Sequence, residues 1–256
     1  MRVLLLSTAD TELLAARAAD AGYVTANPTR LDLAELAALT ADADVVVVRL
    51  LGGHRTWPDG VEALRAGGVP LVLLGGEATP DAELMALSTV PAGVAAETLA
   101  YLREGGIANL RELIRFLSDT LLLTGEGFAA PVAMPAYGVH GSLDPLDPGE
   151  RDPAPPTVGV IFYRAHELSG NTGFVDVLCD AIEAQGANAL PVFCGSLRDA
   201  EPGLLELLGQ VDALVTTVLA AGGVVAADAS AGGDEEAWDA GALAFAPTRV
   251  YLPGHG

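Results

Sequence analysis

The chain has 256 residues, of which 34 are acidic and 13 are basic, so its formal net charge at pH 7 is −21. All 13 basic residues are arginine, because the sequence holds no lysine. This excludes the lysine of a Walker A nucleotide site and the lysine that binds pyridoxal phosphate. Nucleic acid is not expected as a partner, because binding it requires a basic face that releases counterions.

The hydrophobic fraction of 51% is sufficient for sizeable cores and too high for a disordered chain. No membrane span is expected, because the longest uncharged stretch without proline, Ala213–Ala227, is shorter than the roughly 20 apolar residues that a spanning helix needs. The start of the chain, Met1–Ser7, favours a β-strand over a signal peptide. Neither Cys179 nor Cys194 belongs to a CxxC pair, so neither a disulfide framework nor a zinc cluster is expected. These features together predict a cytoplasmic protein.

The first half of the chain alternates short apolar runs with helical patterns, which is typical of a parallel α/β fold. Continuous apolar runs predict strands that are buried on both faces at Arg2–Leu6, Val45–Leu50 and Pro70–Leu74. An alanine- and leucine-rich pattern predicts a helix over Glu12–Ala21, which Gly22 ends. A second helix is predicted after the turn Trp57–Gly60, with Asp59 as its N-cap and its end at Ala66.

The middle of the chain predicts a long helix followed by a connector. Apolar residues recur at 3.6-residue spacing over Asn109–Leu123, with charges between them, which indicates an amphipathic helix. The next stretch, Gly125–Thr157, holds seven of the sixteen prolines and has a polar, extended centre. We therefore place a domain boundary near residue 155 and assign residues 109–155 to the helix and a Pro-rich connector.

The second half repeats the layout of the first. The predicted strands and helices are, in chain order, Val158–Tyr163, Gly173–Gln185, Ala189–Phe193, Glu201–Leu208 and Ala213–Val218. The third strand of each half opens a glycine-bearing loop, at Gly75-Gly76 and Gly222-Gly223. The fold class is therefore α/β, with two Rossmann- or flavodoxin-like parallel-sheet units. They cover residues 1–108 and an incomplete 156–244, and residues 245–256 form a divergent tail.

Ligands of open parallel sheets bind beyond the carboxyl ends of the strands, and two loops expected there carry cationic and imidazole groups. The first contains Arg49, His54 and Arg55, and the second contains Arg164 and His166. Arginine binds a carboxylate through two parallel N–H bonds, and histidine exchanges a proton near neutral pH. Taken alone, Arg49 and Arg55 fit a solvated strand end equally well.

Several residues in these regions have simpler interpretations. Asn171 or Thr172 fits the N-cap of the following helix. His140 and His255 are interpreted as bystanders, and Cys179 as a buried helix residue rather than a nucleophile.

Known catalytic templates do not fit the chain. Gly125–Ala130 matches GxGxxA without the strand that should precede it, and His166-Glu167 starts an HExxH motif that Gly170 breaks. No GxSxG elbow is present. A cluster of four carboxylates could bind a divalent cation: Asp228, Asp234, Glu235 and Glu236. The favoured interpretation of this cluster is the charged start of a helix.

One segment carries a family resemblance. The run VGVIFYRAHELSGNT at Val158–Thr172, followed by Asp176, Leu178, Cys179 and Ala181, resembles the large tetrapyrrole-binding subunit of aerobic cobaltochelatase, the CobN type, which is related to the magnesium-chelatase large subunit. Further stretches follow the same family order: RLLGGHRTW at 49–57, NLRELIRFLSD at 109–119, NALPVFCGSL at 188–197 and the region 212–238. Since family members are several times longer, the chain resembles an N-terminal fragment, which we expect to be inactive alone.

The resemblance implies a ligase that forms nitrogen–metal bonds, inserting the substrate Co²⁺ into hydrogenobyrinic acid a,c-diamide during aerobic cobalamin biosynthesis. It implies an AAA+ ATPase and a companion subunit as partners, which use ATP and Mg²⁺ so that this chain binds neither. Matched onto this sequence, His166 is the expected proton acceptor, Arg164 the carboxylate anchor and Asn171 the cap that fixes the loop. Arg49, His54 and Arg55 form a second expected substrate-binding set, and the metal ligands are unassigned.

The alternative function is a non-catalytic docking or regulatory α/β module that binds the chelatase ATPase subunits. A dinucleotide enzyme is a third possibility, against which the missing glycine fingerprint counts.

Overall fold

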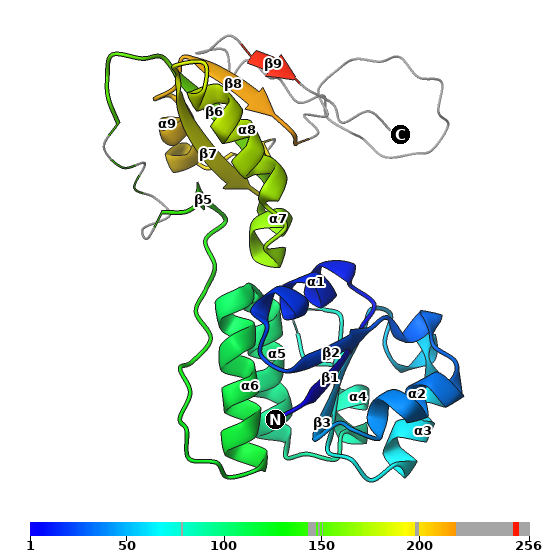
Figure 1. The fold of residues 1–256 in the computed structure, drawn as a ribbon. Helices are drawn as coiled ribbons and strands as arrows, with labels where there is room; N and C mark the ends of the chain where they lie inside the picture. Colours follow the sequence, from blue (N-terminus) through cyan, green and yellow to red (C-terminus); the bar gives the residue numbers. More distant parts are fainter. Residues whose placement is uncertain are drawn as a thin grey trace, which may run out of the picture. The chain divides into compact units, whose positions relative to one another are not determined.

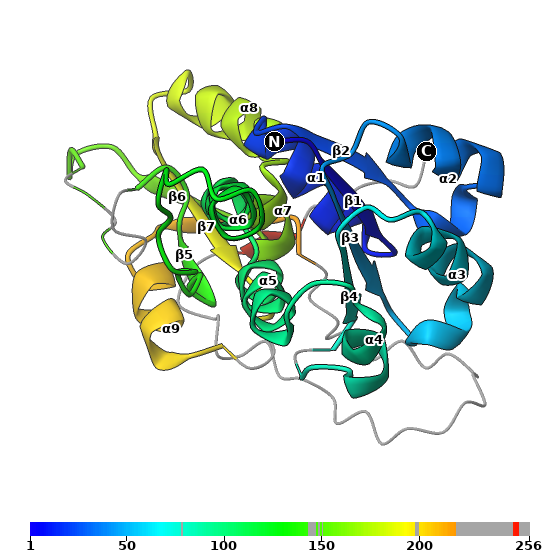
Figure 2. The same ribbon diagram turned by 90° about the horizontal axis from the view of Figure 1, so that it is seen from below.

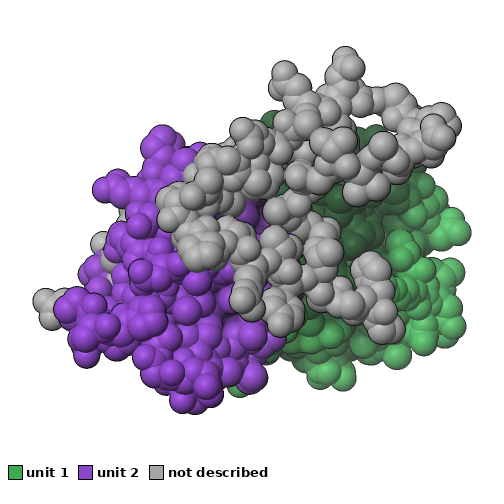
Figure 3. Space-filling model, turned by 90° about the horizontal axis from the view of Figure 1, so that it is seen from above, with its two compact units in different colours: residues 1–134, 168–171 green, residues 135–167, 172–256 purple. Residues whose placement is uncertain are grey.

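The computed structural model describes residues 1–77, 79–142, 147, 149, 151–197 and 200–218, and the backbone of residues 248–250. The chain divides into two compact units, which Figure 3 shows in different colours. The first unit comprises Met1–Met134 and Leu168–Asn171, and the second comprises Pro135–Glu167 and Thr172–Gly256.

The first unit is built on a parallel four-stranded sheet with the strand order β2-β1-β3-β4. The strands are β1 (Val3–Ser7), β2 (Tyr23–Ala26), β3 (Val45–Leu50) and β4 (Leu71–Gly75). Every residue of β1, β3 and β4 is buried, which explains why these strands are continuous apolar runs in the sequence. The edge strand β2 is only half-buried, so it lacks such a run and the sequence analysis missed it.

Helices cover both faces of this sheet (Figures 1 and 2). One face carries α1 (Asp10–Ala19), α5 (Ala92–Glu104) and α6 (Ile107–Leu121). The other face carries α2 (Leu33–Thr40), α3 (Pro58–Ala66) and α4 (Ala82–Leu87). Two short 3₁₀ helices complete the unit: η1 (Pro28–Arg30) and η2 (His54–Thr56).

The helix expected to open the connector packs inside the first unit. Leu110, Leu113 and Leu117 of α6 lie in the same core cluster as the strands β1, β3 and β4. The hydroxyl of Tyr23 in β2 also donates to the carbonyl of Leu110 at 2.7 Å. Residues 109–134 therefore belong to the first unit, whereas residues 109–155 were expected to form a helix and a Pro-rich connector between the units. Amphipathicity identified the helix but not the surface that its apolar face meets.

The extended segment after α6 runs along the same unit. The amide side chain of Asn109 donates to the carbonyl of Val132 at 2.8 Å, and the N–H of Val132 donates back to Asn109 at 2.9 Å. The N–H of Ala129 donates to the carboxylate of Glu112 at 2.8 Å. These hydrogen bonds satisfy the backbone of a proline-interrupted segment that forms no regular structure of its own.

The second unit is built on a mixed five-stranded sheet with the order β5-β7-β6-β8-β9. The strands are β5 (Tyr137–Val139), β6 (Thr157–Tyr163), β7 (Asn188–Cys194), β8 (Ala213–Thr216) and β9 (Thr248–Val250). All neighbouring pairs are parallel except β5 and β7, which are antiparallel. The strand β5 lies within the segment that was expected to be a connector, so that segment contributes an edge strand to this sheet.

Helices flank this sheet too. The helix α7 (Arg164–Ser169) follows β6 directly, α8 (Gly173–Glu183) packs on β6 and β7, and α9 (Pro202–Leu208) lies in the cluster on the opposite face. The α/β class is thus confirmed, with one parallel sheet and one sheet that is parallel except for its edge strand β5. No helix in the described ranges combines the length and apolarity needed to cross a membrane.

One predicted cap is wrong. The helix α3 begins at Pro58 rather than after Asp59, and its N-cap is Trp57, which makes no side-chain capping bond. Proline suits the first helical position because it lacks the N–H that would be left unpaired there. Asp59 therefore lies in the first turn, where its negative charge favours the helix N-terminus.

Candidate functional site

The candidate site begins where β6 ends. The residues after Tyr163, which the sequence analysis treated as a loop, form the short helix α7 and carry Arg164 and His166. The Nε of Arg164 donates to the carbonyl of Pro135 at 2.7 Å, so the guanidinium is attached to the segment before β5. This bond gives Arg164 a defined position at the carboxyl edge of the second sheet.

His166 lies among aromatic side chains. Its ring centroid is 6.5 Å from that of Tyr163 and 5.1 Å from that of Phe174, with the Phe174 ring at a steep angle. The imidazole is half-buried. Aromatic neighbours restrict the orientation of the ring and exclude part of the solvent, so packing fixes the position of this imidazole.

His140, interpreted from the sequence as a bystander, is part of the candidate site. Its Nδ1 lies 2.7 Å from Oε2 of Glu167 in α7, and its Nε2 lies 3.3 Å from Oδ1 of Asp176 in α8. Its ring also packs edge-on against Phe162 at a centroid distance of 5.8 Å. His140 therefore connects the segment after β5 to both helices of the site.

The two carboxylates alter the acidity of His140. The hydrogen bond to Glu167 raises the pKa of the imidazole, and the charges of Glu167 and Asp176 act in the same direction, while burial opposes them. This environment favours the protonated form, so His140 is better suited to position α7 and α8 than to accept a proton. No sequence spacing could reveal this cluster, because its three members come from separate elements.

The raised pKa of His140 predicts that the second unit loses stability as pH rises. The stabilisation is complete below the ordinary pKa near 6.5 and disappears as pH increases through the raised value in the folded protein. We expect the unit to be less stable at pH 9 than at pH 6, on the scale of one charged hydrogen bond, about 1.5 kcal/mol. Urea denaturation followed by the methyl NMR signals of Val160 and Val192 measures the difference.

The matched variants are His140→Gln and His54→Gln. His140→Gln should remove most of the pH dependence of the second unit, and His54→Gln, in the first unit, should leave it intact. An unchanged pH dependence in His140→Gln would contradict the assignment.

Asn171 does not cap the helix that follows the motif. The N-cap of α8 is Thr172, no side-chain capping bond is formed there, and Asn171 is exposed one residue earlier. The expected role of Asn171 as a loop-fixing cap is therefore wrong. Gly170 fixes the turn instead, because its φ of +66° favours glycine, and a Cβ there would lie 2.8 Å from Cδ1 of Ile107.

In the first unit, Arg49 lies inside the protein rather than in solvent. It forms an ion pair with Glu12, and its guanidinium donates to the carbonyls of Gly75, Gly76 and Leu102 at 3.4, 3.0 and 3.3 Å. Burial lowers the pKa of the guanidinium, and the hydroxyl of Ser7 also donates to Glu12, at 2.7 Å. These contacts connect the carboxyl ends of β1, β3 and β4. The guanidinium of Arg49 is therefore bound by polar groups of the first unit at this edge of the sheet.

His54 and Arg55 lie in η2, after β3. The Nδ1 of His54 is 3.3 Å from Oε1 of Glu83, whose side chain is largely exposed. Arg55 is exposed and has no ion pair or hydrogen bond within the part of the chain that the structure describes. The second expected substrate-binding set is thus divided, because Arg49 is buried and Arg55 is exposed.

The described residues give little support to a nucleophilic thiol or to a metal site. Burial is the main cause that raises the pKa of both Cys179 and Cys194, to about 11 in each case, so neither thiol is an activated nucleophile at neutral pH. In the ranges that the structure describes, no three His, Cys, Asp or Glu side chains are arranged to hold a metal ion. The carboxylates Asp228, Asp234, Glu235 and Glu236, the loop Gly222-Gly223 and His255 lie outside the described residues. Of the tail 245–256 only the backbone of Thr248–Val250 is described, and it forms β9, so the second unit extends beyond its expected end at residue 244.

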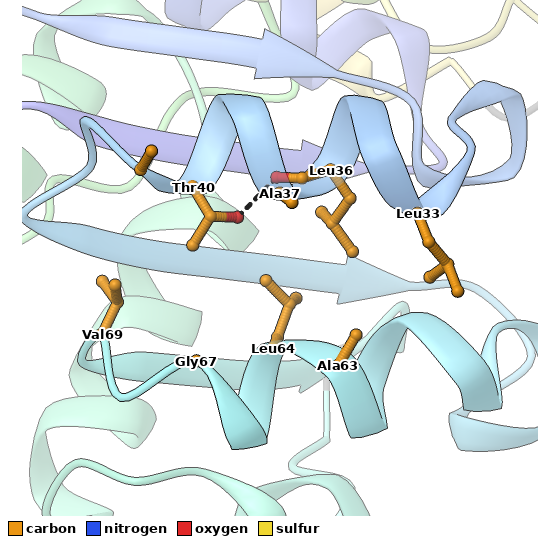
Figure 4. A pocket seen from close by; sticks show the side chains of 9 residues that line it. Leu33, Leu36, Ala37, Thr40, Ala63, Leu64, Gly67 and Val69 are labelled. Atoms are coloured by element: carbon orange, nitrogen blue, oxygen red, sulfur yellow. Dashed lines mark hydrogen bonds between the residues drawn. The ribbon is translucent and has the colours of Figure 1, made fainter.

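A groove of about 360 Å³ in the first unit is apolar and offers no catalytic groups. It lies between α2 and α3, where Leu33 and Leu36 face Ala63 and Leu64 (Figure 4). The hydroxyl of its polar residue Thr40 donates to the carbonyl of Leu36 at 2.7 Å. Because this hydroxyl already binds a carbonyl of its own helix, the groove offers mainly apolar contacts to a ligand.

This chain is similar to a known family and to several known proteins. A family described as CobN/Magnesium Chelatase matches residues 99–249, which include α7 and α8. The aerobic cobaltochelatase subunit CobN of Sinorhizobium sp is 34% identical over 227 residues, covering 77% of this chain and 18% of that protein. Its counterpart from Pseudomonas aeruginosa is 34% identical over 167 residues, covering 62% of this chain and 13% of that protein.

A solved structure agrees with both. The catalytic subunit of cobaltochelatase from Mycobacterium tuberculosis superimposes with a TM-score of 0.86 at 52% identity, covering 98% of this chain and 21% of that one. The chain thus spans about a fifth or less of the length of these relatives.

Proposed function

The chain belongs to the CobN/magnesium chelatase family, and on this premise we propose that it contributes part of the tetrapyrrole site of an ATP-dependent cobaltochelatase. In this proposal the complex inserts Co²⁺ into hydrogenobyrinic acid a,c-diamide on the aerobic route to cobalamin. The observation that carries the proposal is the family match over the helix α7, which presents Arg164 and His166 at the carboxyl edge of the second sheet.

Each residue has a role in this proposal. Arg164, whose Nε donates to the carbonyl of Pro135, binds a peripheral carboxylate of the macrocycle through its guanidinium. His166 accepts a proton that leaves a ring nitrogen when the metal enters. His140 positions α7 by binding Glu167. Asn171, which is exposed near the end of the motif, offers an amide to the substrate.

The proposed partners follow from the same family membership. An AAA+ ATPase and its companion subunit use ATP and Mg²⁺, and cobalt is a substrate of the complex. The lack of lysine supports this division, because the chain has no Walker A lysine of its own. The net charge of −21 would repel an anionic tetrapyrrole at long range, so binding depends on the local cationic groups.

Titration with hydrogenobyrinic acid a,c-diamide, followed by its fluorescence quenching, tests the site. We expect Arg164→Ala to weaken binding at least about tenfold, the scale of one charged hydrogen bond. We expect His166→Ala, made in an otherwise complete subunit, to reduce cobalt insertion more than binding when the complex is assembled with its ATPase subunits. Arg103→Ala, an exposed change in the first unit, is the control. Equal titration and insertion for all three variants would remove the site assignment.

The alternative is a docking module for the ATPase subunits, and the first unit favours it. The carboxyl edge of its sheet is closed by the Arg49–Glu12 pair, which leaves Arg49 engaged with protein groups. A pull-down with the ATPase subunits separates the two functions. Retained partner binding without quenching by the tetrapyrrole would favour the docking module.

A further inference from the structure

The helix α7, which carries the residues of the proposed site, is divided between the two compact units. Its first four residues, Arg164–Glu167, belong to the second unit. Its last two residues belong to the first unit, as part of the segment Leu168–Asn171. The chain returns to the second unit at Thr172, the N-cap of α8. The helix of the site therefore makes contacts of two separate origins.

In the first unit, Leu168 lies against the turn that joins α5 to α6. This turn consists of Gly105, the C-cap of α5, and Gly106, the N-cap of α6, with φ of +67° and +82°. A Cβ on Gly105 would lie 3.9 Å from Cδ1 of Leu168, and a Cβ on Gly106 would lie 3.7 Å from Cδ2. Because these positive φ values favour glycine, the turn presents backbone without side chains to the leucine. Leu168 is half-buried.

Gly170 brings the same segment close to two helices of the first unit. A Cβ on Gly170 would lie 2.8 Å from Cδ1 of Ile107 in α6 and 3.3 Å from Cβ of Ala18 in α1. Ser169, which precedes it, is only 4% exposed. The segment Leu168–Asn171 therefore contacts α1, α6 and the glycine turn of the first unit.

A helix as short as α7 depends on such contacts. It has six residues, and helices below about 12–15 residues are marginal in water on their own. In the second unit, the Nε of Arg164 donates to the carbonyl of Pro135, and Glu167 binds His140. The last turn continues into the first unit, where the apolar contacts of Leu168 hold it.

We propose that Leu168 is a positioning residue of the proposed tetrapyrrole site. Its packing in the first unit keeps the last turn of α7 helical and so fixes the imidazole of His166, two residues earlier. Arg164, at the start of α7, depends instead on its bond to Pro135. Loss of the Leu168 side chain should therefore disturb His166 more than Arg164. The role of His166 rests on the proposed function, whereas the order of α7 is measured without a ligand.

The test compares Leu168→Ala with Leu168→Met and Leu39→Ala in the full chain. Methionine nearly conserves the volume of leucine, so Leu168→Met should keep the contact. Leu39 is also half-buried, but it lies in α2 and packs on the opposite face of the first sheet. Its truncation should therefore destabilise the first unit without changing α7. Circular dichroism verifies that the three variants are folded.

Amide hydrogen exchange measures the order of α7. We expect the exchange of α7 in Leu168→Ala to become roughly five- to tenfold faster, the scale of losing a half-buried leucine side chain. The chain has only four histidines, so the imidazole NMR signal of His166 is readily assigned, and it should shift and broaden in the same variant. Leu168→Met and Leu39→Ala should leave both the exchange and this signal as in the wild type.

Activity provides a separate measurement. In an otherwise complete subunit assembled with its ATPase subunits, Leu168→Ala should lower the rate of cobalt insertion more than the affinity for the tetrapyrrole, because Arg164 keeps its position. Equal losses of both would overturn the positioning role. Unchanged exchange and an unchanged His166 signal in Leu168→Ala, or the same changes in Leu39→Ala, would overturn it as well. A wild type that does not bind the tetrapyrrole would contradict the proposed function instead, and the exchange of α7 would still decide the role of Leu168.

Discussion

Replacing Arg49 by leucine is expected to lower the free energy of unfolding of the first unit by about 3–5 kcal/mol, the cost of breaking a buried ion pair from one side. The side chains of Arg49 and Glu12 are only 11% and 15% exposed, so the variant leaves a carboxylate in a site that solvent hardly reaches. The carbonyls of Gly75, Gly76 and Leu102 lose their donor as well. Urea denaturation followed by the methyl NMR signals of Val47 and Val72 measures the loss.

Two further variants distinguish a structural role of Arg49 from a ligand-binding role. The double variant Glu12→Leu/Arg49→Leu should recover much of the stability, because it removes the unpaired carboxylate. Arg55→Ala, at an exposed position six residues along the chain, should change the free energy of unfolding by no more than about 0.5 kcal/mol. If Arg49→Leu were as stable as the wild type, the internal role of Arg49 would be wrong and its expected role in substrate binding would gain support.

Truncating Leu113 to alanine in α6 should cost the first unit about 2–5 kcal/mol, the range for large-to-small changes in a packed core. Leu113 is completely buried and lies in one cluster with Leu5, Val47 and Leu74 of the sheet. A helix that only connected two units would keep its apolar face partly in solvent, so the same change there would have a small effect. Urea denaturation with the probes used for Arg49→Leu measures the cost.

The matched control is Leu123→Ala, just beyond the end of α6. Leu123 is 83% exposed, so its truncation removes almost no buried surface and should leave the stability nearly unchanged. Similar small effects of Leu113→Ala and Leu123→Ala would show that α6 contributes little to the core, in agreement with the connector that the sequence analysis expected.

The two units differ in what their sheets offer to a ligand. Both place an arginine at or next to the carboxyl end of a strand, Arg49 in the first unit and Arg164 in the second. Arg49 is surrounded by acceptors of its own unit, and Arg164 lies on a helix that also carries the imidazole of His166. The proposed tetrapyrrole contacts are assigned to α7 because of this imidazole and the family match over the helix.

The sequence by itself determined the elements whose pattern is a direct consequence of burial. The strand Val45–Leu50 has the predicted bounds, because a strand buried on both faces must be apolar throughout. The strands β6 and β8 begin within one residue of their predicted starts, although β8 is buried only at alternate residues. The α6 helix was predicted because one apolar stripe must recur every 3.6 residues. The family was apparent in the motif at Val158–Thr172, which the match over residues 99–249 includes.

Only the tertiary structure decided which polar groups meet. His140 reaches Glu167 across 27 positions of sequence, and Arg49 reaches Glu12 across 37. Nothing in the local pattern around either residue specifies such a partner, because the pairing depends on which strand ends lie side by side. The same reason explains two findings that the sequence did not predict. His140, interpreted as a bystander, connects the elements of the candidate site. Arg49, expected to bind substrate, is bound by polar groups of its own unit.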